Sequence, residues 1–216
     1  MQDGKSRVEF NSGELSLEGV LAIPEGTGPF PAVVVCHPHP LYGGSMNNNV
    51  VNSVCEALTH ASFVTLKFNF RGVGRSQGKF SQGIGEQEDV SAAISFVVSA
   101  REVDPERIGL VGYSAGAGFG IPVGVKDARI EALAAISPPL SMFDFEFLKD
   151  YPKPKFLISG NLDDFTPTSQ FVEFCRNLPE PKDYHTVNGA DHFWWGYESV
   201  LATKVTTFFT EVLKCR

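Results

Sequence analysis

Short apolar stretches alternate with amphipathic stretches along nearly the whole chain. Continuous runs rich in Val and Ile are typical of buried strands, and apolar positions that recur every three or four residues are typical of helices. The runs that indicate strands are 8–10, 15–23, 32–36, 63–69, 108–112, 130–136, 155–160 and 184–187. The runs with helical spacing lie within 50–58, 86–98, 115–125, 171–178 and 201–212. The pattern therefore predicts about eight strands separated by helices.

A chain that alternates in this way predicts an α/β fold, with a mostly parallel sheet covered by helices on both faces. We expect a single domain, 1–216, because 216 residues of which 43% are hydrophobic can form a substantial core. Residues 137–150 interrupt the alternation with several Phe among acidic residues. This segment is either a small cap over an active site or a connecting helix with a buried aromatic face.

Charge and hydropathy narrow the range of partners. Lys and Arg number 18 against 25 Asp and Glu, which gives a net charge of -7, and no basic run occurs. We therefore expect no nucleic acid partner. No apolar stretch approaches the roughly 18 residues of a membrane span, and residues 1–9 are polar. We expect no membrane partner and a cytoplasmic location, and the sequence leaves the oligomeric state open.

A candidate nucleophile, Ser114, lies in Gly112–Gly116, which fits the pattern G-x-S-x-G. The pattern is common by chance, but here it joins the end of a strand run to the start of a helical run. A sharp strand-to-helix turn strains the serine, requires small neighbours, and places the hydroxyl at a helix N-terminus. The alternative is a glycine-rich turn that only packs against the sheet.

A serine hydroxyl needs a base to take its proton and a carboxylate to orient that base. Asp163 follows the next-to-last strand run and His192 follows the last. Asp164 competes with Asp163 for the acidic role. His60 and His185 are weaker candidates for the base, because His60 ends a helix and His185 lies within a strand run, whereas His192 follows the last strand run in a loop.

The chain resembles the α/β-hydrolase superfamily over essentially its whole length. Three blocks carry the resemblance: the elbow pattern at 112–116, the G-x-x-D-x-x-x-P pattern at 160–167, and the G-x-D-H pattern at 189–192. Residues 37–44 and 69–76 look like those of a compact, nearly lidless, esterase-like branch. The resemblance implies an α/β-hydrolase fold of about eight strands with a minimal cap.

The resemblance also implies roles for individual residues. Ser114 would be the nucleophile, His192 the base and Asp163 the orienting acid. Asp163 is favoured over Asp164 because it matches the family position between Gly160 and Pro167.

Acyl transfer also needs two N–H groups directed at the developing oxyanion. Ala115, directly after the nucleophile, supplies the first. In the loop after 32–36, Pro38 and Pro40 have no N–H, so His39 and Leu41 are the nearby donors. The resemblance places His39 at the family's oxyanion position. Its side chain either lines the pocket or is exposed to solvent.

His37 and His39 invite a metal hypothesis, because two histidines two residues apart can share one ion. No further histidine or acid follows in that loop, so we expect no metal. The glycines at 72, 74 and 78 miss the dinucleotide-binding spacing, and we expect no cofactor.

A serine nucleophile favours esters, thioesters or amides as substrates. Aromatic residues near the motifs suggest an apolar acyl pocket, although core packing explains each equally well; they are Tyr113, Phe143, Phe147, Trp194 and Trp195. We expect a carboxylesterase that acts on small acyl esters through an acyl-enzyme on Ser114. The alternatives are a thioesterase or peptidase, a non-catalytic binding protein of the same fold, and a metal-dependent hydrolase.

Overall fold

The computed structural model describes residues 4–214, so 1–3 and 215–216 of the expected domain lie outside it. Each apolar run of the sequence overlaps one element of the fold. The strands are β1 (Lys5–Ser12), β2 (Leu15–Ala22), β3 (Phe30–Cys36), β4 (Val64–Phe68), β5 (Val103–Tyr113), β6 (Ile130–Ile136), β7 (Lys155–Leu162) and β8 (Lys182–Asp191). The helices are α1 (Asn49–His60), α2 (Ile84–Val98), α3 (Ala115–Lys126), α4 (Thr168–Arg176) and α5 (Glu198–Lys214). Two short 3₁₀ turns are η1 (Pro40–Tyr42) and η2 (Glu146–Asp150).

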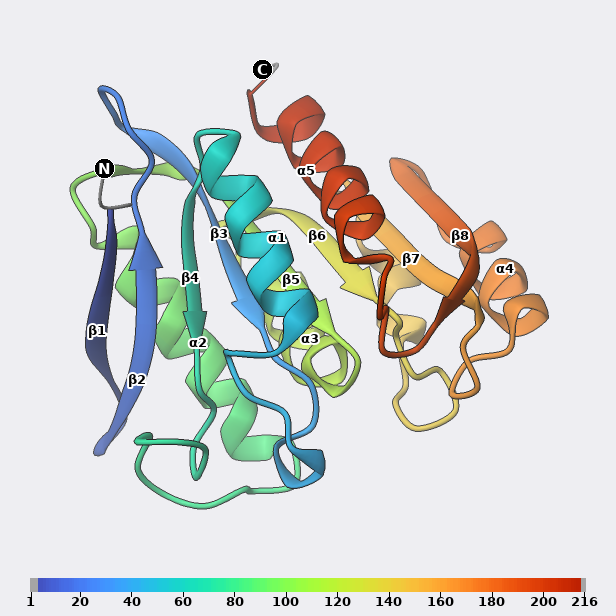
Figure 1. Ribbon diagram of the computed structural model, residues 1–216, viewed down its shortest axis with the longest axis horizontal. Coiled ribbons are helices and arrows are strands. Elements are labelled where there is room, and N and C mark those ends of the chain that lie inside the picture. Colours follow the sequence, from blue (N-terminus) through green and yellow to red (C-terminus); the bar gives the residue numbers. More distant parts are fainter. Residues whose placement is uncertain (1–3, 215–216) are drawn as a thin grey trace.

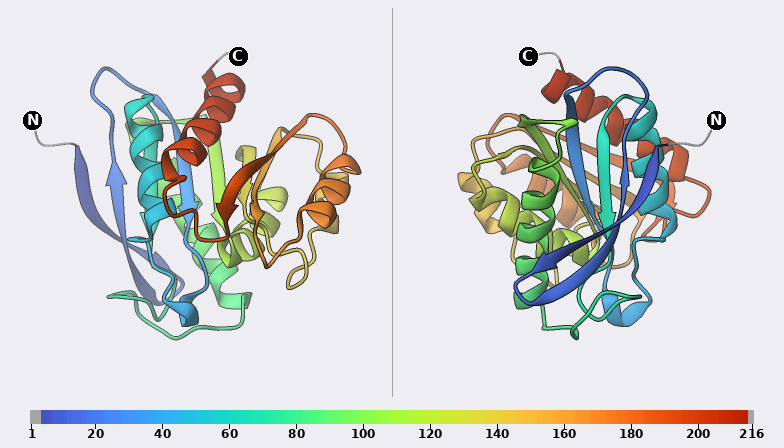
Figure 2. Two further views of the ribbon diagram at one scale, coloured as in Figure 1. Left: turned by 45° about the vertical axis from the view of Figure 1, so that its right-hand side comes forward. Right: turned by 90° about the vertical axis from the view of Figure 1, so that its left-hand side faces the viewer.

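The strands form one eight-stranded sheet in the order β1-β2-β4-β3-β5-β6-β7-β8 (Figure 1). β2 pairs antiparallel with β1 and β4, and all other neighbours are parallel. Helices α1 and α5 cover one face, and α2 and α3 cover the other (Figure 2). The mostly parallel, two-faced sheet expected from the sequence is thus confirmed.

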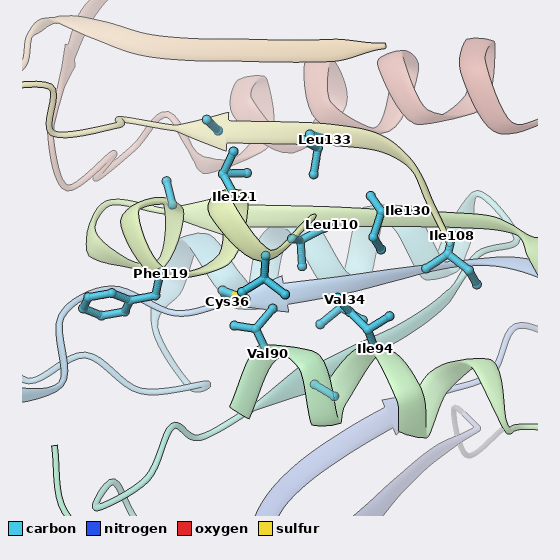
Figure 3. Close-up of a cluster of buried hydrophobic side chains, with 14 of the residues drawn as sticks. Val34, Cys36, Val90, Ile94, Ile108, Leu110, Phe119, Ile121, Ile130 and Leu133 are labelled. Atoms are coloured by element: carbon cyan, nitrogen blue, oxygen red, sulfur yellow. The ribbon is translucent and has the colours of Figure 1, made fainter. Parts of the chain in front are cut away.

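The sequence of the central strand β3 is continuously apolar because both faces of the strand are buried. Val33 and Val35 pack with the side chains of α1 and α5, whereas Val34 and Cys36 pack with those of α2 and α3. Figure 3 shows the second cluster, in which the side chains of β3 and β5 meet those of both green helices. Alternate residues of a strand face opposite sides, so a strand buried on both faces has no polar position.

Two segments differ from the expectation. The sequence predicts that Pro105 lies in a loop between a helix and the next strand. In the structure Pro105 lies within that strand, β5. The proline is tolerated because the pairing with β3 is irregular between Val103 and Ile108. Residues 137–150 form no α-helix but a loop with the turn η2, whose Phe145 and Leu148 are buried in the core.

The fold places chemistry-bearing residues at one edge. Ser114, Asp163 and His192 are each the first residue after a strand, namely β5, β7 and β8. Because these strands are parallel, their carboxyl ends meet at the same edge of the sheet, the lower edge in Figure 1. Within residues 4–214, no helix has the length and apolar character needed to cross a bilayer.

Candidate active site

Ser114 occupies a strained turn between β5 and α3. Its backbone angles are φ 54° and ψ -125°, which an L-residue rarely adopts. Its N–H donates to the carbonyl oxygen of Ile136 at 2.9 Å. A Cβ on Gly116 would come within 2.4 Å of the His37 carbonyl oxygen, and one on Gly112 would come within 2.4 Å of the Ala117 Cα. The flanking glycines are therefore required by the close approach of backbone to backbone.

The structure brings Ser114, His192 and Asp163 into one hydrogen-bonded chain. Ser114 Oγ lies 2.9 Å from His192 Nε2. His192 Nδ1 lies 3.0 Å and 2.9 Å from the two carboxylate oxygens of Asp163. Asp163 is 5% exposed, whereas Asp164 is exposed to solvent. The geometry matches a nucleophile, a base and an orienting acid, with Asp163 rather than Asp164 in the third position.

The Asp163 carboxylate is held in its ionised form. Burial by itself raises the pKa of this group, but hydrogen bonds outweigh that effect and hold the pKa below its ordinary value. They come from His192 and from the backbone N–H of Phe165, whose nitrogen lies 3.0 Å from Oδ1. The Ser159 hydroxyl also donates to Oδ2, at 3.3 Å. An ionised carboxylate accepts a hydrogen bond from the N–H at His192 Nδ1 and so favours the tautomer whose Nε2 carries no proton and can accept that of Ser114.

Aromatic side chains surround the His192 imidazole. The Phe165 ring centroid lies 4.3 Å from that of His192, and Phe193 approaches edge-on at 5.6 Å. Tyr113 Oη donates to the carbonyl oxygen of His192 at 2.8 Å. The imidazole is therefore shielded from water on several sides, and its loop is bonded to the strand that carries the nucleophile.

Two backbone amides remain available for an oxyanion. Leu41, one of the two predicted donors, gives its N–H to His39 Nδ1 at 3.2 Å. Across residues 4–214, the N–H groups of His39 and Ala115 have no hydrogen-bond acceptor. Both residues line the same cavity as Ser114. The His39 ring packs on that of Tyr42, another residue of the lining, with a centroid distance of 4.8 Å.

The two histidines of the metal hypothesis are used differently. His37 is fully buried; its Nδ1 lies 2.6 Å from the Pro38 carbonyl oxygen, and its Nε2 accepts the N–H of Phe70 at 3.1 Å. Both ring nitrogens are therefore occupied by protein groups and are not directed at a shared ion with His39. Burial lowers the pKa of His37 to about 4, although its bond to Pro38 acts in the opposite direction. Within residues 4–214, no group of three or more His, Cys, Asp or Glu side chains is placed to hold a metal.

A cavity of about 380 Å³ opens beside Ser114 and is lined mainly by apolar groups. Its lining comprises Pro38, His39, Tyr42, Gly43, Gly44, Asn48, Tyr113, Ser114, Ala115, Pro139, Met142, Phe143, Phe165, His192 and Phe193. Tyr113 and Phe143 were expected here, and Pro139, Met142 and Phe143 bring the segment 137–150 to the wall of the pocket.

Three of the predicted pocket residues are wrong. Trp194 is fully buried beneath the site, because its indole is anchored to Ser137. Trp195 is 70% exposed outside the cavity, and Phe147 packs against the core. Phe165 and Phe193 are lining residues that the sequence analysis missed. Their positions in the sequence could have indicated this, since each lies within two residues of a predicted catalytic side chain.

Comparison with known proteins agrees with this geometry. Residues 13–151 match the family model of X-Pro dipeptidyl-peptidase (S15 family). The chain belongs to this family. The match includes the turn at Ser114 but ends before Asp163 and His192.

Relatives of this S15-family chain extend the similarity over most of its length. The protein RP471 of Rickettsia prowazekii is 35% identical over 197 residues, which cover 87% of this chain and 82% of that protein. The chain spans only 45% to 64% of several other curated relatives. An alpha-beta serine hydrolase homologue from Coxiella burnetii is 31% identical with a TM-score of 0.86, covering 94% of this chain and 96% of the other.

The protein XC6422 of Xanthomonas campestris, described as a serine hydrolase without lid, is 26% identical with a TM-score of 0.85. This similarity covers 99% of our chain and 97% of XC6422. The expected α/β-hydrolase fold is confirmed, and the chain is a serine hydrolase of that superfamily.

Proposed function

We propose that the chain is a carboxylesterase that hydrolyses small, neutral acyl esters through an acyl-enzyme on Ser114. One observation carries the proposal: the hydrogen-bonded chain from Asp163 through His192 ends at Ser114 Oγ, in the wall of an apolar cavity. Two backbone N–H groups that have no acceptor within residues 4–214, those of His39 and Ala115, line the same cavity.

Acylation follows from this geometry. His192 Nε2 takes the proton of Ser114 Oγ as that oxygen attacks the ester carbonyl carbon. The carbonyl oxygen gains negative charge and accepts hydrogen bonds from the N–H groups of His39 and Ala115. When the tetrahedral intermediate collapses, its C–O bond to the alcohol breaks and His192 gives its proton to the leaving oxygen.

Deacylation repeats the sequence with water as the nucleophile. His192 takes a proton from water, the hydroxide attacks the acyl carbon, and the proton returns to Ser114 Oγ as the carboxylic acid leaves. In both halves Asp163 stays ionised and stabilises the imidazolium that forms beside it. The hydrogen bonds that lower its pKa support this role.

The lining of the cavity favours neutral substrates. It contains no Asp, Glu, Lys or Arg side chain among the described residues, and its walls include Met142, Phe143 and Phe165. A charged group on the substrate would lose water there without gaining a partner. A small apolar acyl group would instead bury its surface against these side chains.

The family match supports a second candidate, a dipeptidyl-peptidase. An enzyme that removes dipeptides from an N-terminus must bind a free ammonium group close to the scissile bond. No carboxylate lines the described cavity to receive that charge, since Asp163 is turned to His192. The ester is therefore the favoured substrate. A thioester would be hydrolysed by the same steps. Only a measurement with both kinds of substrate can distinguish a thioesterase from an esterase.

A labelling experiment and a substrate panel test the proposal together. A fluorophosphonate probe is expected to label the wild type but not the Ser114→Ala variant. The panel contains p-nitrophenyl acetate, butyrate and octanoate, a butyryl thioester, and Ala-Pro-p-nitroanilide. We expect the highest kcat/KM for a short ester. Faster cleavage of the dipeptide anilide would replace the esterase by a peptidase, and absence of labelling would argue for a binding protein.

A further inference from the structure

One wall of the cavity beside Ser114 is an aromatic ring that packs on the helix of the nucleophile. Phe143 lines this cavity and comes from the segment 137–150. Its ring lies against α3, with its centroid 5.5 Å from that of Phe119 and an interplanar angle of 81°. Phe143 is half-buried, and Phe119 is a buried member of the core. The Phe143 ring therefore has the cavity on one side and the core on another.

No side chain fits at Gly118 while this ring is in place. A Cβ at Gly118 would lie 2.4, 2.5 and 2.6 Å from three ring carbons of Phe143, which are its three nearest atoms. Gly112 and Gly116 are different, because a Cβ at either position would meet backbone atoms. A helix interior by itself favours alanine over glycine. The glycine at 118 therefore serves to seat the Phe143 ring against α3.

Hydrogen bonds fix the loop that carries the ring. The N–H of Phe143 donates to the carbonyl oxygen of Pro139 at 3.1 Å. The hydroxyl of Thr166, which is 1% exposed, accepts the N–H of Leu140 at 3.1 Å and donates to the carbonyl oxygen of Pro138 at 2.7 Å. The turn before Phe143 is thus bonded to itself and to the loop after β7. A ring on such a turn cannot withdraw freely to admit a longer substrate.

The chemistry of the reaction decides which part of the substrate meets this wall. His192 gives its proton to the leaving oxygen, so the alcohol leaves beside the imidazole, where Phe165 and Phe193 pack at centroid distances of 4.3 and 5.6 Å. Phe143 packs instead on Gly118, whose N–H donates to the carbonyl oxygen of the nucleophile at 3.4 Å. The wall therefore faces the acyl part of the substrate rather than the alcohol.

We propose that Phe143 limits the length of the acyl chain that this site accepts, and that Gly118 holds the ring in the position where it does so. The substrates are then esters of short-chain acids, whose acyl group ends before it reaches the ring. A longer chain meets the ring and cannot bring its carbonyl carbon to Ser114 Oγ. The inference rests on the proposed acyl-enzyme on Ser114 and adds the residue that sets its substrate range.

The decisive variant is Phe143→Ala, which removes the wall and opens space against Gly118 and Phe119. Among p-nitrophenyl esters, the ratio of kcat/KM for octanoate to that for butyrate should rise roughly tenfold or more, because the added methylenes can then be buried. Phe147→Ala is the matched control. It removes the same ring from the same segment, at a half-buried position that packs on the core, and should leave the ratio within twofold of the wild type.

A second variant, Gly118→Ala, tests the seat of the ring. The added Cβ displaces the Phe143 ring from α3 toward the cavity that it lines. We expect kcat/KM for butyrate to fall roughly tenfold and that for acetate to fall less. In the double variant Gly118→Ala/Phe143→Ala there is no ring to displace, so kcat/KM for butyrate should return to within threefold of Phe143→Ala alone. An alanine that merely destabilised the helix would not be rescued by the loss of a second side chain.

A series of acetate esters separates the acyl side from the alcohol side. Methyl, butyl and octyl acetate keep the acyl group constant, and Phe143→Ala should leave their relative kcat/KM values as in the wild type. A change in this series without one in the acyl series would show that the ring limits the alcohol, and it would overturn the proposal. The proposal also fails if the octanoate-to-butyrate ratio is unchanged in folded Phe143→Ala, or if Phe147→Ala raises it equally.

Covalent labelling distinguishes failure of this inference from failure of the esterase proposal. A p-nitrophenyl alkylphosphonate reacts once with Ser114, and the butyl or octyl group on its phosphorus stands in for the acyl chain. If the wild type is labelled but hydrolyses no ester, the esterase proposal fails, while a higher octyl-to-butyl ratio of labelling rates in Phe143→Ala still supports the acyl wall. Equal ratios in both proteins would overturn the wall, and an unlabelled wild type would overturn both proposals.

Folding of each variant is checked by circular dichroism. If Phe143→Ala does not fold, Phe143→Leu replaces it, because leucine keeps an apolar contact with α3 but is shorter than the phenyl ring. The octanoate-to-butyrate ratio should then rise in the same direction by a smaller factor, about threefold. An unchanged ratio in folded Phe143→Leu would count against the proposal in the same way.

Discussion

The two halves of the active site are held in place by different kinds of bonds. On the nucleophile side, the backbone fixes the geometry: Ser114 N–H donates to Ile136, glycines allow close approach, and the proposed oxyanion donors at His39 and Ala115 are main-chain groups. On the acid–base side, side chains fix it. Asp163 and His192 lie in loops and are held by hydrogen bonds to each other and to neighbouring hydroxyl and amide groups.

This difference follows from where the residues sit. Ser114 joins a central strand to a helix that packs on the sheet, so the surrounding secondary structure leaves it little freedom. β8 is an edge strand and β7 is its only neighbour in the sheet, and the loops after them need side-chain bonds to become rigid. We therefore expect the nucleophile side to be sensitive to changes in the backbone and the acid–base side to changes in single polar atoms.

The largest loss of activity should come from removing the two groups that react directly, one from each side of the site. Ser114→Ala and His192→Ala should each lower kcat by roughly 10⁴-fold or more with little change in KM, because either variant ends proton transfer from the nucleophile. Steady-state kinetics on a p-nitrophenyl ester measure this. Hydrolysis of the ester by Ser114→Ala at a near wild-type rate would refute the assignment of the nucleophile.

A single-atom change on the acid–base side should be almost as damaging. Asp163→Asn keeps the shape of the side chain but can present a donor to His192 Nδ1, which favours the wrong tautomer; we expect a fall in kcat of about 10⁴-fold. Asp164→Asn is the matched control next to it, exposed to solvent, and should stay within twofold of the wild type. A larger loss for Asp164→Asn would exchange their roles.

On the nucleophile side, loss of one amide should matter more than loss of a side chain. His39→Pro deletes the N–H and should cost roughly 10²- to 10³-fold in kcat, whereas His39→Ala keeps the N–H and most of the activity. The φ of His39 is -55°, which a proline ring accepts, so a folded variant is expected. If His39→Ala is as damaging as His39→Pro, the imidazole itself acts on the substrate.

The same difference explains what could be predicted from the sequence. The strands and helices follow from apolar periodicity, and the strained turn at Ser114 leaves a local signature because it demands glycines at fixed offsets. Asp163 and His192 have weaker local patterns around them. They could be predicted because each follows a strand run in the order expected for the three motifs. The position of Pro105 within β5 could not be read, because it depends on irregular pairing with a strand far away in the sequence.

The pocket was the least predictable part of the site. Trp194 and Trp195 are adjacent and chemically identical, yet one is fully buried and the other is 70% exposed. Their directions depend on a positive φ at Trp194 and on the Ser137 hydroxyl, which is distant in the sequence. An aromatic residue near a motif does not by itself indicate which way its ring points, so composition could not separate lining from core.

The smallest expected effect on catalysis concerns His37, a side chain that supports the nucleophile side. It joins the carbonyl oxygen of Pro38 to the N–H of Phe70 and so fixes the start of the loop that carries His39. Because burial lowers its pKa from an ordinary 6.5 to about 4, His37 is neutral in the folded protein at pH values where the unfolded chain is already protonated.

The consequence is a pH dependence of stability with a definite sign. Above pH 6.5 both states hold a neutral His37 and its contribution is complete; between pH 6.5 and about 4 the unfolded state alone gains a proton, so the free energy of unfolding falls by about 3 kcal/mol. Urea denaturation of the wild type and His37→Gln at several pH values measures this. The variant should be less stable at pH 7 but should lose less stability on acidification, since glutamine does not titrate. Equal losses in both proteins would show that His37 is protonated in the folded state and that carboxylates cause the acid sensitivity.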